Sequence, residues 1–356
     1  MILKHIELRD WRSYESLSLD LPSGLTVIEG SNGAGKTNLA EAIYYLSLAH
    51  SWRVDSDWPL IREGCQEASL IAVIREGDLS RTIGITLTKS GKKISVNGKP
   101  IRRLSEMSSL VNVILFSPAD TSIFTGSPGE RRNFLDINLS KQSDEYFSLL
   151  GKYNHLLGER NASLKAPRPD ERYIEVLTDE MIRTEKPLVG WRDAYVQRLN
   201  AVLTPLASSI FGSSRSVRLS YKAFLPVSDN FIEDAKNVYQ RALESDLLHK
   251  STSIGIHRED FSLALDGKNI GLYGSQGENR LAAIALKLSP YELIDDKEKK
   301  PIAVLDDVYS ELDSTHAERL TTYLNNLGQT FVTAAKLDIS GASYIEVADH
   351  KATRRN

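Results

Sequence analysis

The sequence predicts an α/β fold in which a domain built on a parallel sheet is interrupted by an inserted, mainly helical lobe. Three observations predict it. A glycine-rich turn joins an apolar run to a helical pattern in residues 29–43, a second apolar run ends in two aspartates in residues 301–313, and long helical patterns lie between them. We therefore expect one part of the α/β domain at 1–117, the helical lobe at 118–250 and the other part at 251–356.

Strands are expected at the start of the chain. Ile2, Ile6 and Leu8 share one parity with polar residues between them, and the runs "SLSLDL" (16–21) and "LTVIEG" (25–30) follow as the next two strands.

A helix follows the glycine-rich turn. Leu39, Ile43 and Leu46 recur at the spacing of one helical face. Residues 70–102 then return to short strands, with a hairpin signal at Asn97-Gly98.

The inserted lobe is expected to consist mainly of long helices. The helical pattern of its second half is interrupted by a proline and a glycine. The predicted elements are helices at 130–160 and 171–208, with a break near Pro187 and Gly190, a strand at 216–221 and a helix at 231–248, before strands return with "FSLALDG".

Composition narrows the class of protein. The chain has 356 residues, of which 41% are hydrophobic and 26% are charged, as in ordinary globular proteins. The single cysteine, Cys65, excludes a disulfide framework and a cysteine-rich zinc site. That cysteine content points to a reducing compartment, so we expect a cytoplasmic protein. No long uninterrupted apolar run occurs, so we expect no membrane span. The net charge of −3 leaves only a local basic face for binding nucleic acid.

The glycine-rich turn fits the pattern G-x-x-x-x-G-K-[ST] between a strand and a helix. Its backbone amides and the following helix N-terminus are suited to phosphate oxygens. Lys36 would reach the terminal phosphates, and Thr37 would give its hydroxyl to Mg²⁺. A strand-to-helix turn with flexible glycines is the alternative. The predicted binding residues are Gly30, Ser31, Asn32, Gly33, Ala34, Gly35, Lys36, Thr37 and Asn38.

The acids that a magnesium nucleotide requires come late in the chain, in "PIAVLDDVYSELD" (301–313). The run Ile302–Leu305 is typical of a central parallel strand, and ligands collect at the carboxyl ends of such strands. We expect Asp306 to coordinate Mg²⁺ through water and Asp307 to polarise the attacking water. Two acids that cap a strand are the alternative.

A second anion-binding end is predicted in "YGSQGENRLAAIALKLS" (273–289). Ser275 and Gly277 open a helix there, and a hydroxyl and a glycine amide at a helix N-terminus suit a phosphate. An ordinary helix cap is the alternative.

Together these motifs resemble one family, RecF, in the ABC-type ATPase group that includes Rad50 and the SMC proteins. The residues that carry the resemblance run in order along nearly the whole chain. They are "DWRSYESLSLDL", "GSNGAGKTNLAEAIYYLS", "HSWR", "FSPAD", "GSPGERRNFLD", "GERNASLK", "GIHRED", "SQGENRLAAIALKL" and "LDDVYSELD".

The resemblance implies a role for each motif. The glycine-rich turn is similar to a Walker A loop, Asp306 and Asp307 to a Walker B pair, and Ser310–Asp313 to a D-loop. Ser275–Glu278, with Gln276 and Gly277, is similar to an ABC signature, and Arg12 is implied to contact the nucleotide.

The family's activity and partners are implied by the same resemblance. In this group the signature of one subunit completes the nucleotide site of another, so ATP closes a head-to-head homodimer. The resemblance implies a weak, DNA-stimulated ATPase that binds double-stranded DNA or gapped junctions and helps RecO and RecR to load RecA.

Several residues depart from the family pattern. Glu278 and Asn279 stand where glutamines are anticipated, and "GIHRED" has Ile256 and Glu259 at positions of proline and aspartate. Thr333 occupies the place of the switch histidine of transporters, from which slow hydrolysis would follow.

DNA contacts are predicted at basic residues on several elements. Each of them is also consistent with an ordinary solvated charge. The candidates are Arg53, Arg131, Arg132, Lys152 and Arg160, with Arg102 and Arg103 as further basic points and His257 with Arg258 either joining the lobes or contacting DNA.

Three other functions compete. An ABC transporter subunit is disfavoured by the missing histidine and the helical insert. A GTPase would want a glycine where Tyr309 stands and an asparagine that "AAKLD" (334–338) lacks. A DNA clamp with a vestigial ATPase stays open.

Overall fold

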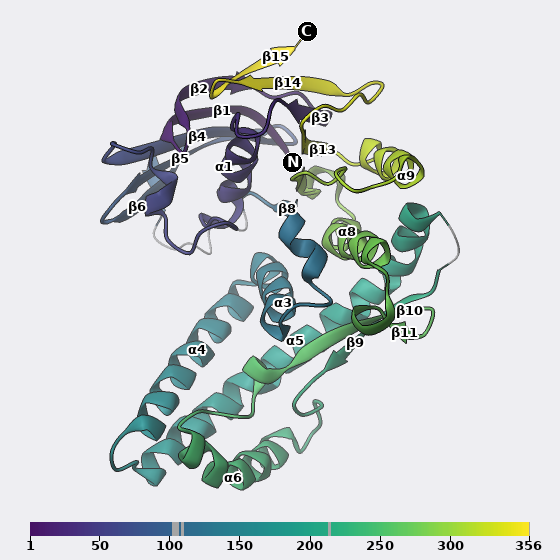
Figure 1. The fold of residues 1–356 in the computed structure, drawn as a ribbon. Coiled ribbons are helices and arrows are strands. Elements are labelled where there is room, and N and C mark those ends of the chain that lie inside the picture. The colour runs from purple at the N-terminus through teal and green to yellow at the C-terminus, as the bar shows by residue number, and fades with distance from the viewer. Residues whose placement is uncertain (102–106, 108–109, 213–214, 356) are drawn as a thin grey trace. The chain divides into compact units, whose positions relative to one another are not determined.

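The computed structural model describes residues 1–101, 107, 110–212 and 215–355. The chain forms two compact units, both drawn in Figure 1. The first unit comprises Met1–Thr121, Pro205–Arg215 and Gln276–Asn356, and the second comprises Ser122–Thr204 and Ser216–Ser275. The second unit thus continues to Ser275, beyond the predicted lobe of 118–250. Residues Pro205–Arg215, within the predicted lobe, belong to the first unit.

The described residues of the first unit form two sheets. Its antiparallel sheet has the order β2-β1-β4-β5-β6-β7, and its mainly parallel sheet has the order β15-β14-β3-β13-β12-β8. The strands are β1 (Ile2–Trp11), β2 (Tyr14–Asp20), β3 (Gly24–Glu29), β4 (Glu67–Glu76), β5 (Leu79–Thr88), β6 (Gly91–Val96), β7 (Lys99–Pro100), β8 (Val113–Phe116), β12 (Ile302–Leu305), β13 (Gln329–Ala334), β14 (Ser343–Ala348) and β15 (Lys351–Arg355), and the helices are α1 (Lys36–Leu48), α8 (Gln276–Glu292) and α9 (Ser314–Asn325).

Helix α1 forms the centre of this unit. It lies against the antiparallel sheet in Figure 1, and it also contacts β8, β12 and β13 of the other sheet. Leu39, Ala40, Tyr44 and Tyr45 are therefore buried on different sides of the helix. A helix that is apolar all round is a buried helix, and this burial fixes the turn that precedes it.

Three adjacent strands of the parallel sheet carry the functional segments. β13 lies between β3 and β12, in parallel register with both. The glycine-rich turn follows β3, and Asp306 follows β12 directly. Because the carboxyl ends of parallel strands meet at one edge of a sheet, this topology brings the two motifs together.

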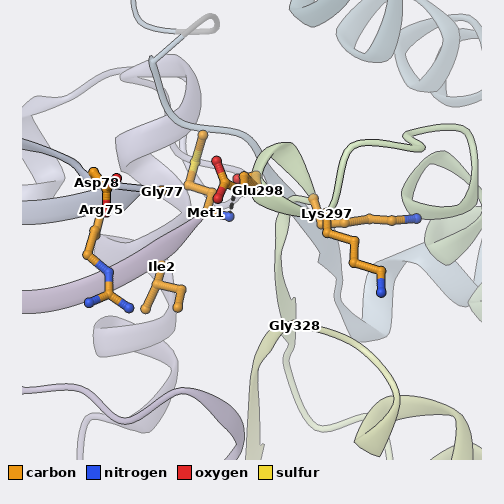
Figure 2. Close-up of a pocket in the computed structure, with 9 residues that line it drawn as sticks. Met1, Ile2, Arg75, Gly77, Asp78, Lys297, Glu298 and Gly328 are labelled. Carbon is orange, nitrogen blue, oxygen red and sulfur yellow. Dashed lines mark hydrogen bonds between the residues drawn. The ribbon is translucent and has the colours of Figure 1, made fainter.

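The two sheets of the first unit are joined near the chain's start. The buried Gln329 side chain accepts from the backbone N–H of Leu3 and donates to the carbonyls of Leu3 and Pro22. Figure 2 shows a pocket beside this join, where the Met1 ammonium donates to the Glu298 carbonyl. These contacts attach β1 to the segment that leads into β12.

The second unit is mainly helical, with a small antiparallel sheet in the order β11-β10-β9. Helix α5 continues into the first unit, where Pro205–Phe211 belong. The elements are α3 (Pro128–Gln142), α4 (Asp144–Lys165), α5 (Glu171–Phe211), β9 (Val217–Lys222), α6 (Phe231–His249), β10 (Asp260–Leu265), β11 (Lys268–Asn269) and α7 (Ile270–Tyr273).

Two predictions about this unit are wrong. The helix expected at 130–160 is two helices, α3 and α4, with Ser143 between them. Helix α5 runs without a break through Pro187 and Gly190, where an interruption was expected. Leu188 and Val189 are fully buried, so packing along the helix holds this segment despite its two poor helix formers. Among the described residues, no helix is both long enough and apolar enough to cross a membrane.

Candidate nucleotide-binding site

The glycine-rich turn wraps tightly before α1. Gly35 has a φ of 119°, and Gly33 has a φ of 81°, values that favour glycine. A side chain at Gly30 would meet the carbonyl oxygen of Val347 at 2.1 Å, so only glycine fits beside β14. The motif's glycines are therefore required by backbone geometry as well as by the ligand.

Lys36 is turned back over the loop. Its ammonium donates to the carbonyls of Gly30 at 2.7 Å and Ser31 at 2.8 Å. Burial lowers the pKa of Lys36, while the nearby charges of Asp307 and Asp306 raise it. A cation held over backbone amides and facing two carboxylates is the arrangement that a polyphosphate with a metal would complete.

Thr37 and Asp306 are brought together from opposite ends of the chain. The Thr37 hydroxyl donates to Asp306 Oδ1 at 3.0 Å, and Thr333 donates to the same oxygen at 2.7 Å. Asp306 is buried. Hydroxyl and carboxylate oxygens are the ligands that Mg²⁺ prefers, so this donor set fits the metal.

Asp307 points to solvent, unlike its neighbour. Its side chain is exposed and its φ is 50°, in the left-handed region. Hydrogen bonds hold its backbone N–H and its carbonyl in place. The N–H donates to Thr333 Oγ1 at 2.9 Å, and the carbonyl accepts from Ser310 and Arg280.

These residues line one cavity of about 470 Å³. Its lining combines the glycine-rich turn with the ends of the two neighbouring strands. The lining residues are Asn32, Gly33, Gly35, Lys36, Thr37, Asn38, Arg53, Pro118, Asp306, Asp307, Thr333 and Ala335.

Arg53, one of the predicted DNA contacts, lines this cavity. Its guanidinium donates to Asn38 Oδ1 and to the buried carboxylate of Glu41. The side chain is still 39% exposed, so it retains capacity for a ligand. A sequence signal for this position was available, because "HSWR" (50–53) follows α1 closely. After the helix the chain brings Arg53 beside the glycine-rich turn.

Arg12 is placed beside a second cavity. It makes two hydrogen bonds with the buried Glu41 carboxylate and one with the Pro59 carbonyl. Asn38 lines both cavities, and Trp58, which is 60% exposed, lines the second one with Arg12.

The signature-like segment lies at a helix start. Ser275, Gln276 and Gly277 are exposed, and α8 begins at Gln276. In the second turn of α8, Arg280 is buried and donates to the Val308 carbonyl and the Glu311 carboxylate. The structure thus links this helix directly to the segment after Asp306, a contact that the sequence did not indicate.

Two predicted DNA contacts are corrected by burial. Arg160 is 1% exposed and donates to Asp246 at 2.8 Å, and Arg131 is 8% exposed and forms two hydrogen bonds with Asp260. Their guanidinium groups are used within the second unit and do not face solvent.

The other basic candidates differ in exposure. Arg132 is half-buried and donates to the Glu259 carbonyl, and Lys152 is exposed and pairs with Glu180. His257 is hydrogen-bonded to Tyr153 and to the Thr252 carbonyl inside the second unit. Arg102 and Arg103 lie outside the described residues.

Known proteins are similar to this chain along most of its length. Residues 2–347 match the family described as "RecF/RecN/SMC N terminal domain". The "DNA replication and repair protein RecF" of Lachnoclostridium phytofermentans is 33% identical over 95% of this chain and 94% of its own length, and that of Lactobacillus johnsonii is 32% identical over 99% and 96%.

The chain belongs to the RecF family. Its recognition from sequence motifs is thereby confirmed.

Solved structures agree with this assignment. The "recombination mediator protein RecF-ATPrS in RecFOR pathway" matches with a TM-score of 0.91 and 29% identity, covering 99% of this chain and 98% of that one. An Smc head domain from Pyrococcus furiosus matches with a TM-score of 0.60 and 17% identity, which supports the fold alone. The predicted ABC-type head with a helical lobe is confirmed for this RecF-family chain.

Proposed function

We propose that this RecF-family protein is an ATP-dependent DNA-binding protein of recombinational repair and replication restart. ATP with Mg²⁺ would close a head-to-head homodimer, and slow hydrolysis would open it. The observation that carries the proposal is the convergence of Lys36, Thr37, Asp306 and Asp307 on one cavity. The names of the related proteins, which refer to DNA replication, repair and ATP, support it.

Each side chain of the cavity has a distinct task in this proposal. Phosphate oxygens would replace the carbonyls of Gly30 and Ser31 as partners of the Lys36 ammonium. Thr37 and Asp306 would hold Mg²⁺, which supplies positive charge against the β- and γ-phosphates. Arg53 would add a second cation at the same phosphates.

Asp307 is proposed as the residue that activates water. Its exposed carboxylate would orient a water against the γ-phosphorus and accept its proton. As the new oxygen–phosphorus bond forms, the bond to the β,γ-bridging oxygen breaks, and ADP leaves with that electron pair.

The second cavity is a suitable place for the nucleoside. It has a volume of about 690 Å³ and adjoins the phosphate cavity at Asn38. The exposed indole of Trp58 offers a flat apolar surface, and Arg12 and Ser13 offer polar groups. Apolar surface with a few polar groups is typical of nucleoside sites.

The dimer part of the proposal depends on the start of α8. Ser275, Gln276 and Gly277 are exposed there, and a helix N-terminus attracts anions. A second copy that presents this end to the triphosphate would complete both sites symmetrically.

DNA and protein partners complete the proposal. We expect double-stranded or gapped DNA, with Arg132 and Lys152 as the remaining predicted contacts, and RecO and RecR as partners in the cytoplasm. The match to structures from the RecFOR pathway supports these partners. DNA is expected to stimulate a weak ATPase.

Calorimetry with ATP and Mg²⁺ tests the proposal. The wild-type protein should bind ATP more tightly than GTP, and Lys36→Met should abolish binding because it removes the phosphate-facing cation. Lys93→Met, an exposed lysine on β6, is the matched control and should bind like wild type. Wild-type protein without affinity for ATP would contradict the proposal.

Two other functions stay testable. An SMC-like clamp with a vestigial ATPase is favoured by Thr333 at the place of a switch histidine, and it would bind ATP without turnover. An ABC-type nucleotide-binding subunit of another complex would not change its sedimentation with gapped DNA and ATP. ATP turnover together with an ATP-dependent DNA complex distinguishes our proposal from both.

A further inference from the structure

Thr333 occupies a central position between the two halves of the site. It lies near the end of β13, the strand between β3 and β12, and is 2% exposed. Its hydroxyl donates to Asp306 Oδ1 at 2.7 Å and accepts from the Asp307 N–H at 2.9 Å. The Thr333 hydroxyl therefore acts as a hydrogen-bond donor to Asp306 and as an acceptor from Asp307, the next residue.

The bond to Asp307 supports an unfavourable backbone conformation. A φ of 50° is uncommon for a residue with a side chain and persists where surrounding contacts determine it. Thr333 holds the N–H of Asp307, while Ser310 and Arg280 hold its carbonyl. The direction of the Asp307 carboxylate thus depends on the Thr333 hydroxyl.

The bond to Asp306 restrains the carboxylate that would bind the metal. Asp306 Oδ1 accepts from Thr333 and from Thr37, which would itself be a ligand of Mg²⁺. Residues that orient a metal-binding carboxylate tune both affinity and activity. Thr333 is the one of these two donors that comes from the sheet, so it can restrain Asp306 while Thr37 serves the metal.

We propose that Thr333 is a positioning residue for ATP hydrolysis, because its hydroxyl sets both the orientation of Asp306 and the backbone of Asp307. The proposal rests on the proposed function of this cavity. It gives Thr333 a task different from that of a histidine that contacts phosphate, since Thr333 acts through the two acids.

The same strand provides a matched control. Thr330 is also on β13 and fully buried, but its hydroxyl has no hydrogen-bond partner within the described part of the chain. Thr333→Val and Thr330→Val therefore make the same chemical change, and only the first removes hydrogen bonds to the acids. Thr333→Ser keeps the hydroxyl.

Steady-state ATP hydrolysis at varied Mg²⁺ tests the proposal. Thr333→Val should lower kcat by about 10- to 100-fold, raise the Mg²⁺ concentration needed for half-maximal rate, and leave KM for ATP little changed. Thr333→Ser and Thr330→Val should resemble wild type. A Thr333→Val protein with wild-type kcat and Mg²⁺ requirement would overturn the proposal.

Two further measurements keep the test decisive. If Thr333→Val does not fold, as judged by circular dichroism, Thr333→Ala compared with Thr333→Ser replaces it and must show the same loss. If the wild-type protein does not hydrolyse ATP, the proposed function fails. Calorimetric ATP binding at varied Mg²⁺ then decides on Thr333. Thr333→Val should need a higher Mg²⁺ concentration than wild type for half-maximal ATP binding, and an equal Mg²⁺ requirement would overturn the role.

Discussion

The nucleotide cavity of the first unit and the buried arginines of the second unit use similar charged residues in opposite ways. In the cavity, Lys36 begins α1 and Asp307 lies on the loop after β12, and each keeps a group directed at solvent or at backbone that a ligand can replace. In the second unit, Arg192 is 2% exposed and its guanidinium is used by Asp136, Glu259 and the Ile256 carbonyl.

The difference shows where charge serves function and where it serves the fold. Buried arginines that are paired with acids join helices and loops distant in sequence, and losing one partner leaves a charge uncompensated. The Asp307 side chain in the cavity is exposed, so it contributes little to packing. Substitutions in the cavity should therefore remove activity without loss of stability, and substitutions in the arginine network should do the reverse.

The largest effect is expected from Asp307→Asn. The change should lower kcat for ATP by about 10²- to 10⁴-fold, because the amide cannot take the proton of the attacking water. The free energy of unfolding should stay near that of wild type, since the carboxylate is exposed. ATPase assays and urea unfolding measure both, and loss of stability in place of activity would break the comparison.

Arg192→Met should produce the opposite result. Removing this guanidinium leaves the buried Glu259 and the partly buried Asp136 without their cation, at a cost of about 3–5 kcal/mol in unfolding free energy. ATP binding by the protein that remains folded should be unchanged. Arg183→Met is the control, because its pair with Glu180 is exposed and should contribute little. Equal stability of the two variants would contradict the role of the network.

A smaller, pH-dependent effect would sharpen the comparison. Burial raises the pKa of Glu185 to about 7, and the charge of Glu259 adds to the rise. Hydrogen bonds from Tyr239, the Ile256 N–H and Tyr153 act in the opposite direction and lower this pKa. The unfolded carboxyl ionises near 4.5, so this group lowers stability as pH rises from 4.5 to 7.

His257 acts in the opposite direction in the same cluster. Burial lowers the pKa of His257 to about 4, so the unfolded chain takes up the proton first and stability falls as pH drops from 6.5 to 4. The two slopes oppose each other in wild type. In Glu185→Gln, stability should rise with pH between 4.5 and 6.5, as measured by urea unfolding, and a profile parallel to that of wild type would count against this account.

The elements of the cavity could be predicted because local chemistry determines them. The positive φ values of Gly33 and Gly35 favour glycine, which accounts for the glycine pattern. The apolar run Ile302–Leu305 is a buried strand that ends directly before Asp306 and Asp307. The order of strand, turn and helix is thus readable without distant contacts. The roles of Thr333 and Arg280 were not readable, because they depend on how α8 and β13 pack beside the acids.

The arginines show the limit of reasoning from sequence. Arg131 and Arg160 look like surface charges along a helix, but their acids, Asp260 and Asp246, lie 129 and 86 residues away. A one-dimensional pattern does not indicate such pairings. Pro187 likewise looked like a helix break, and tertiary packing carried the helix through it.

The central claim, that two copies enclose the nucleotide, is tested most directly by sedimentation velocity of Asp307→Asn with saturating ATP and Mg²⁺. The account predicts a dimer with ATP and a monomer without it. Adding Ser275→Arg, at the exposed start of the signature segment, should leave ATP binding intact and keep the protein monomeric. An Asp307→Asn protein that binds ATP and still sediments as a monomer would contradict the claim.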